Sequence, residues 1–177
     1  MRHEVTRDLQ REVREHHLDA ALGFCPLELP ELSYTPLFDE TLVVLMRDDH
    51  PLRAHERLTL QDLVGARVVV VGGKGAPESG YSLLVRRLFA DAGVEPDYDE
   101  MRALLPPYPL DDGVTVAVNV EQDLGPRIVA VPLDPPRTCP FALICRTGSQ
   151  RPLIGTFIAF ALDYAASQGW TNDTARA

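Results

Sequence analysis

The sequence lacks an apolar run that approaches the roughly 20 residues needed to cross a bilayer. It also lacks the apolar core of a signal peptide, because residues 1–14 are rich in charged side chains. From these two absences we expect a cytoplasmic chain that makes no contact with a membrane.

Positive charge is scarce. The chain has 17 Lys and Arg against 26 Asp and Glu, which gives a formal net charge of −9. Binding to a phosphate backbone needs clustered Lys and Arg. The sequence therefore does not predict that this chain contacts DNA by itself.

Cysteine is also scarce and is unevenly spaced. The three cysteines are Cys25, Cys139 and Cys145, and no two of them form a C-x-x-C pair. An odd count without such a pair favours free thiols over a disulfide framework. We predict three buried thiols that behave as small hydrophobic side chains, with no role as zinc ligand or nucleophile.

The motifs of nucleotide-binding enzymes and hydrolases are missing. Lys74 precedes Gly75, so the glycine-rich stretch is not a Walker A loop, and Glu78 occupies the third glycine position of G-x-G-x-x-G. No serine lies in a G-x-S-x-G elbow. We expect neither an enzyme nor a cofactor.

A metal site is not predicted either. His16 and His17 are adjacent and diverge on a helix, and Asp19 lacks a matching ligand spacing. Solvated histidines at a helix end explain this cluster better, because they suit the helix dipole. The acidic pairs at 39–40 and 48–49 flank a buried strand, so solvated strand ends explain them better than acid–base chemistry.

What the sequence does contain is a regular alternation of apolar strands and amphipathic helices. Hydrophobic residues make up 45% of the 177 residues, which is enough for a core. Alternation of this kind favours an α/β fold with a mainly parallel sheet. The expected helices are 3–17, 61–63 (after an N-cap at Thr59), 81–92 and 153–166; the expected strands are 18–24, 41–47, 68–71, 114–120, 128–133 and 141–146, with 35–38 as a brief edge pairing.

The strongest local feature is the loop 72–80, which leads from a strand into a helix. Glycines allow close backbone approach, and the free N–H groups of a helix start favour an anion such as a carboxylate. Ser79, Tyr81 and Ser82 could add hydroxyl groups. A plain strand–helix connection explains the loop equally well, so the two interpretations stay open at this point.

Taken in order, several short stretches resemble the effector-binding domain of LysR-type transcriptional regulators. No single stretch is specific, but their succession over residues 5–165 is. The matching stretches are 18–23 (Leu-Asp-Ala-Ala-Leu-Gly), 37–44, 49–52 (Asp-His-Pro-Leu), 58–63, 79–81 (Ser-Gly-Tyr), 88–96, 131–134 and the strand that ends at Arg146.

This resemblance implies a two-lobed, periplasmic-binding-protein-like (type 2) fold with mainly parallel sheets. One lobe would comprise 1–45 and 134–177 and the other 46–133, with strands 41–47 and 128–133 as the hinge. A small, anionic effector would lie between the lobes and alter transcription. By analogy, the ligand-binding residues would be Gly73, Gly75, Ser79, Gly80, Tyr81, Ser82, Phe24, Cys25 and Gly113.

The sequence also departs from the family. Nothing in it corresponds to the family's winged helix-turn-helix, so DNA would be reached only through an N-terminal domain of a parent protein. The first strand, helix and second strand of the first lobe have no counterpart, so that lobe is incomplete and a sheet edge is left open to another chain. We expect a homodimer or a higher homo-oligomer, and weak ligand binding by this chain alone.

One side of the expected cleft differs in sequence from the family's pattern. Residues 105–113 are rich in proline where the family has a helix, and Thr115 stands where a second glycine is typical. The effector class therefore cannot be carried over. A stand-alone solute-binding domain of the same fold is the alternative, and an enzyme on this fold, with Ser79 and Asp112 as candidates, is a more distant one.

Overall fold

The structure is a computed structural model, and it describes residues 6–71, 79–101, 110–119, 124, 127–149 and 151–170. The chain divides into two compact units. Unit 1 comprises 1–40, 79–81 and 139–177, and unit 2 comprises 41–78 and 82–138.

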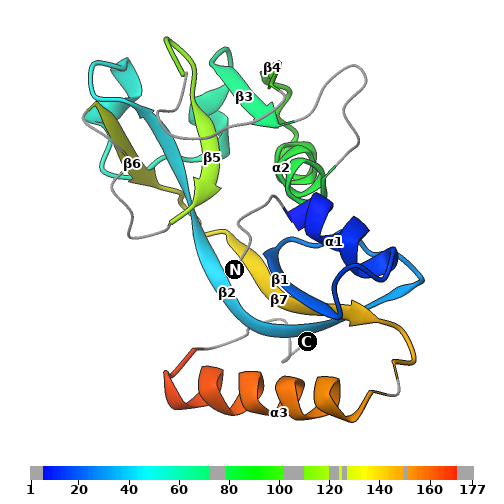
Figure 1. Ribbon diagram of the computed structural model, residues 1–177. Helices are drawn as coiled ribbons and strands as arrows, with labels where there is room; N and C mark the ends of the chain where they lie inside the picture. Colours follow the sequence, from blue (N-terminus) through cyan, green and yellow to red (C-terminus); the bar gives the residue numbers. More distant parts are fainter. Residues whose placement is uncertain are drawn as a thin grey trace. The chain divides into compact units, whose positions relative to one another are not determined.

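Strands outnumber helices in the described part of the chain (Figure 1). In chain order the elements are α1 (Thr6–Arg14), β1 (Ala20–Phe24), β2 (Leu32–Arg47), the 3-10 turns η1 (Pro51–Ala54) and η2 (Leu60–Leu63), β3 (Arg67–Val71), α2 (Gly80–Asp91), β4 (Asp97–Met101), β5 (Thr115–Val118), β6 (Ile128–Pro132), β7 (Thr138–Arg146) and α3 (Pro152–Ser167). Strands β4 to β7 follow one another without a described helix between them. No helix in the described part of the chain is long and apolar enough to span a membrane.

Unit 1 is a sheet covered on both faces. Strand β1 pairs antiparallel with β7, and the sheet continues to β2. Helix α1 packs on one face, where Val13, Ala21, Leu32 and Ile144 form a buried cluster. Helix α3 packs on the other face (Figure 1), over a second cluster that includes Leu143.

Unit 2 contains the second half of β2, which pairs antiparallel with both β5 and β6. Strands β3 and β4 form a separate parallel pair, connected by α2. Val43, Leu45, Val69 and Leu110 form its buried cluster. The side chains on residues 41–47 of β2 and on β3 are mainly Val and Leu, as is typical of strands that are buried on both faces.

The prediction of mainly parallel sheets is wrong. The pairings β1–β7, β2–β5 and β2–β6 are antiparallel, and only β3–β4 is parallel among the described strands. A parallel pair needs a crossover connection, usually a helix, and α2 supplies one between β3 and β4. Strands β5 and β6 each pair antiparallel with β2, and β7 pairs antiparallel with β1, so the partners of these strands lie far from them in sequence.

Local predictions were more accurate than pairings. Thr59 caps η2, and its hydroxyl accepts a hydrogen bond from the Asp62 N–H at 3.2 Å. Gly93 ends α2 with a φ of +67°. Two predicted strand segments, 35–38 and 41–47, are parts of the single long strand β2, and β4 was not predicted.

The prediction of three free thiols is also wrong. Cys25 and Cys139 form a disulfide with their Cα atoms 6.0 Å apart, whereas Cys145 is a buried free thiol. The two bonded cysteines are 114 residues apart in sequence. The β1–β7 pairing brings them together, since the Cys25 N–H donates to the Pro140 carbonyl at 2.8 Å.

Candidate ligand-binding site

The first turn of α2 lies directly against the end of β1 within unit 1. A Cβ atom added to Gly80 would lie 1.9 Å from the carbonyl oxygen of Cys25 and 2.9 Å from the carbonyl carbon of Pro26. Any other residue would require this backbone to move, so the close approach needs glycine. The family resemblance placed Phe24 and Cys25 among the ligand-binding residues, and the structure places Cys25 next to Gly80.

Phe24 and Cys25 are held firmly at the strand exit. Cys25 is 5% exposed and has a φ of +43°, a left-handed conformation that is uncommon outside glycine. The ring of Phe24 packs 4.6 Å from that of Phe141, centroid to centroid. The chain therefore turns sharply at Cys25, away from the sheet and past the first turn of α2.

The sequence analysis raised the start of α2 as a place for an anion. Residues 80–83 carry no acidic side chain, and the N-terminus of a helix carries a partial positive charge. Ser79 and Tyr81 are half-buried in unit 1 and make contacts of their own. Backbone N–H groups beside such hydroxyls can hold a carboxylate without any cationic side chain.

The remaining predicted residues belong to unit 2 or lie outside the described residues. Ser82 and Gly113 belong to unit 2, where Ser82 is 3% exposed within α2. A Cβ atom on Gly113 would lie 3.0 Å from the Arg67 carbonyl oxygen, so packing against β3 is enough to require glycine there. Gly73 and Gly75 lie outside the described residues. Ligand binding by any of these residues stays a prediction.

The turn at Gly113 is fixed by an arginine that the sequence analysis did not single out. Within unit 2 the Arg67 guanidinium donates to the Asp99 carboxylate at 2.6 Å and to the Leu110 carbonyl at 2.9 Å. The same group lies 2.9 Å from a carboxylate oxygen of Asp112. Asp112, the candidate of the enzyme hypothesis, is thus engaged in an ion pair.

A shallow groove of about 400 Å³ lies in unit 2 at the end of α2, away from Gly80 in sequence. Its cation, Arg86, is already engaged, because it lies 4.6 Å from the ring centroid of Tyr98 and 2.5 Å from the Glu100 carboxylate. The groove therefore offers no unengaged positive group to an anionic ligand.

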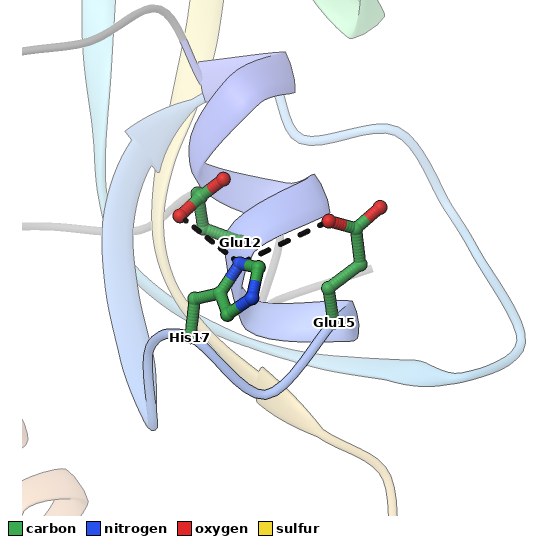
Figure 2. Close-up of side chains that lie close together, drawn as sticks. All are labelled: Glu12, Glu15 and His17. Carbon is green, nitrogen blue, oxygen red and sulfur yellow. Dashed lines mark ion pairs between the residues drawn. The ribbon is translucent and has the colours of Figure 1, made fainter.

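A cluster of ionisable side chains lies at the end of α1 in unit 1 (Figure 2). His17 Nδ1 lies 3.4 Å from a carboxylate oxygen of Glu12 and 3.9 Å from one of Glu15. His17 and Glu15 are exposed, and His17 forms an ion pair with each of the two carboxylates when the imidazole is protonated. The predicted helix-end histidine is therefore present, with two carboxylates beside it that the sequence analysis did not pair with it.

Comparison with known proteins identifies the family to which this α/β domain belongs. The LysR substrate binding domain matches residues 1–166. The chain belongs to this family, which is one of transcriptional regulators rather than enzymes.

Among curated proteins, the Hca operon transcriptional activator HcaR of Escherichia coli (strain K12) is 33% identical over 97 residues. This match covers 52% of the chain and 31% of HcaR. An uncharacterized HTH-type transcriptional regulator of Bacillus subtilis (strain 168), YvbU, is 30% identical over 92 residues, which cover 51% of the chain and 29% of that protein. The matches therefore span less than a third of either relative.

Solved structures share the fold. The effector binding domain of a BenM variant has a TM-score of 0.77 at 22% identity, with 96% of this chain and 81% of that chain covered. The effector binding domain of QuiR, solved in complex with shikimate, has a TM-score of 0.76 at 20% identity, with 93% and 79% covered. The BenM domain has also been solved with its effector benzoate, with a TM-score of 0.74 at 23% identity and 96% and 79% covered.

Proposed function

We propose that this chain senses a small anionic effector for a LysR-type regulator and holds the ligand's carboxylate at the first turn of α2. The observation that carries the proposal is the packing of Gly80 against Cys25, which leaves no room for a Cβ atom. This packing fixes the backbone N–H groups of the helix start beside the end of β1. Fixed donors need no reorganisation when an anion arrives.

The ligand class follows from the site and from the relatives. Benzoate and shikimate, named for the BenM and QuiR domains, are both carboxylates at neutral pH. The chain has a net charge of −9, so attraction of an anion must be local rather than general. A helix N-terminus supplies such a local field.

The link to transcription is part of the proposal. An effector alters a regulator only if it binds two states of the protein with different affinity. The predicted lobes, 1–45 with 134–177 and 46–133, would provide the two states, with the ligand between them. DNA would be contacted by another part of a longer protein, and a homodimer or higher oligomer would transmit the change.

Ligand binding can be tested on the 177-residue chain by thermal unfolding with millimolar benzoate and shikimate. Benzamide and benzyl alcohol are the matched controls, because they keep the ring and remove the negative charge. A ligand that binds only the folded state raises the midpoint in proportion to the logarithm of its concentration. We expect at least one carboxylate, and neither neutral control, to do so.

Two results would contradict the proposal. One is the absence of stabilisation by every member of a panel of aromatic and aliphatic carboxylates. The other is equal stabilisation by benzoate and benzamide, since the site as described recognises the charge.

A further inference from the structure

The segment that follows Cys25 is held by side chains from two other elements of unit 1. Gln10 comes from α1 and Tyr34 from β2, and both reach the backbone of residues 27–29. Gln10 is only 2% exposed, and its helix also contributes the apolar side chains Leu9 and Val13 to a buried cluster. A buried amide in such a place must have hydrogen-bond partners.

Gln10 binds the backbone of Leu27 at both of its polar groups. The Leu27 N–H donates to Gln10 Oε1 at 3.0 Å, and Gln10 Nε2 donates to the Leu27 carbonyl at 2.7 Å. The side-chain amide thus pairs with both backbone groups of one residue, as a neighbouring strand does in an antiparallel sheet. It fixes both the position and the orientation of that peptide segment. An apolar residue of the same size could fill the space but would fix neither.

Tyr34 makes the remaining hydrogen bonds of this network. Its Oη accepts hydrogen bonds from the Leu29 N–H at 3.0 Å and from Gln10 Nε2 at 3.1 Å, and its hydroxyl donates to the Leu27 carbonyl. Burial raises the pKa of Tyr34, so the phenol keeps the proton that it donates. Every polar atom of the two side chains is therefore used on the same short segment.

This segment forms one side of the candidate ligand site. Leu27 is two residues beyond Cys25 and one beyond Pro26, which together contact Gly80. We propose that Gln10 and Tyr34 are positioning residues that hold the backbone of residues 25–27 against the first turn of α2, and so set the affinity for the effector. This inference rests on the proposed function, because it names residues that serve the same site without contacting the ligand.

A purely structural role for Gln10 makes a different prediction. If Gln10 contributes only to stability, replacing it will change amide exchange and ligand affinity in the same way as replacing another buried residue of α1 with a similar cost in stability. Val13 provides this comparison, since it lies on the same helix, is 0% exposed and makes no side-chain hydrogen bond to the segment. Val13→Ala is therefore the matched control for Gln10→Leu.

Amide hydrogen exchange on the full chain, without ligand, tests the network itself. In Gln10→Leu we expect the Leu27 amide to exchange about tenfold faster or more, because its acceptor is lost. In Tyr34→Phe we expect the faster exchange at Leu29, while Leu27 stays protected by Gln10. Val13→Ala should change neither amide selectively, and the same exchange pattern in all three variants would overturn the inference.

Affinity for a probe tests the second step. With whichever of benzoate or shikimate binds the wild-type chain, Gln10→Leu should weaken binding about fivefold or more, and Val13→Ala by less than twofold. An equal loss of affinity in the two variants would show that Gln10 contributes to stability only. If neither probe nor any other carboxylate binds the wild-type chain, the proposed function fails, and the exchange pattern still decides whether the network fixes residues 27–29.

Discussion

The two faces of the sheet in unit 1 are built from different interactions. The face under α3 has the larger apolar cluster, formed by the buried residues Leu37, Leu143, Cys145, Ile154 and Ala165. The face under α1 has a smaller apolar cluster and the buried amide of Gln10 within it. Apolar contact contributes stability without direction, whereas hydrogen bonds fix the position of what they hold.

Aromatic rings extend the α3 face across all three strands. The ring of Phe141 on β7 lies 4.6 Å from Phe24 on β1 and 4.9 Å from Phe38 on β2, between centroids. Phe38 in turn lies 4.7 Å from Trp170, beyond the end of α3. This face is expected to provide most of the stability of unit 1, and the α1 face most of the positioning of the site.

The largest effect is expected on the α3 face. Leu143→Ala removes a side chain that is 0% exposed in the centre of β7, and it should lower the free energy of unfolding by about 2–5 kcal/mol. Leu153→Ala is the control, because Leu153 is 78% exposed on α3 and should change stability by about 0.5 kcal/mol or less. Urea denaturation measures both, and similar values for the two would contradict the description of this face.

The second largest effect on stability is expected at Gly80 in α2, and Gly155 in α3 provides the comparison. Gly80→Ala places a methyl group against the backbone of Cys25, and it should cost about 1–3 kcal/mol or more and weaken carboxylate binding. Gly155→Ala, in the first turn of α3, meets no described atom within 4 Å and should stabilise the chain by about 0.5–1 kcal/mol. An Ala at position 80 that leaves both stability and binding unchanged would remove the basis of the site.

A smaller effect concerns coupling between residues. In a double-mutant cycle, Gln10→Leu and Tyr34→Phe should be non-additive by about 0.5–2 kcal/mol, because the two side chains share the Leu27 carbonyl. Gln10→Leu and Leu143→Ala lie in separate clusters and should be additive within about 0.5 kcal/mol. The reverse pattern would show that the two faces are not independent.

The smallest effect is on the pH dependence of stability. Burial raises the pKa of Tyr34 above its ordinary value of 10.0. The unfolded chain therefore loses this proton at a lower pH than the folded chain does. The stability that the protonated Tyr34 contributes is fully present below pH 10, and it is lost as the pH rises through the pKa of the folded state. Tyr34→Phe should lose less stability than the wild type between neutral pH and the alkaline range in parallel urea titrations, and an equal loss would contradict a buried phenol.

Local features of the fold could be predicted from the sequence because they depend on neighbouring residues. The N-cap at Thr59 and the valines of β3 each determine their own segment. Strand β4 was missed because it is polar, with side chains that stay at least partly exposed. A strand of that composition lacks the apolar alternation by which strands are predicted.

Pairing could not be predicted, since it depends on residues that are far apart in the chain. Nothing local indicates that β1 pairs antiparallel with β7, and this pairing is what brings Cys25 to Cys139. An odd number of cysteines does not exclude one bridge and one free thiol. The parallel arrangement holds only where a helix lies between the strands, at β3 and β4.

The candidate site could be predicted in part. Glycine ahead of an amphipathic helix indicated the first turn of α2, and the family resemblance added the end of β1. Gln10 was missed because a single polar residue beside the apolar positions of α1 has the pattern of a surface residue. Its partners, Leu27 and Tyr34, are 17 and 24 residues away in sequence, so only the folded chain reveals them.

The most direct test of the central claim is a nuclear magnetic resonance titration of the 15N-labelled chain with benzoate and with shikimate. If a carboxylate binds at the first turn of α2, the amide signals of Gly80, Tyr81 and Cys25 should show the largest shifts and should saturate. Saturable shifts that centre on the groove at Arg86 and Tyr98, or no saturable shift with any carboxylate, would contradict the account.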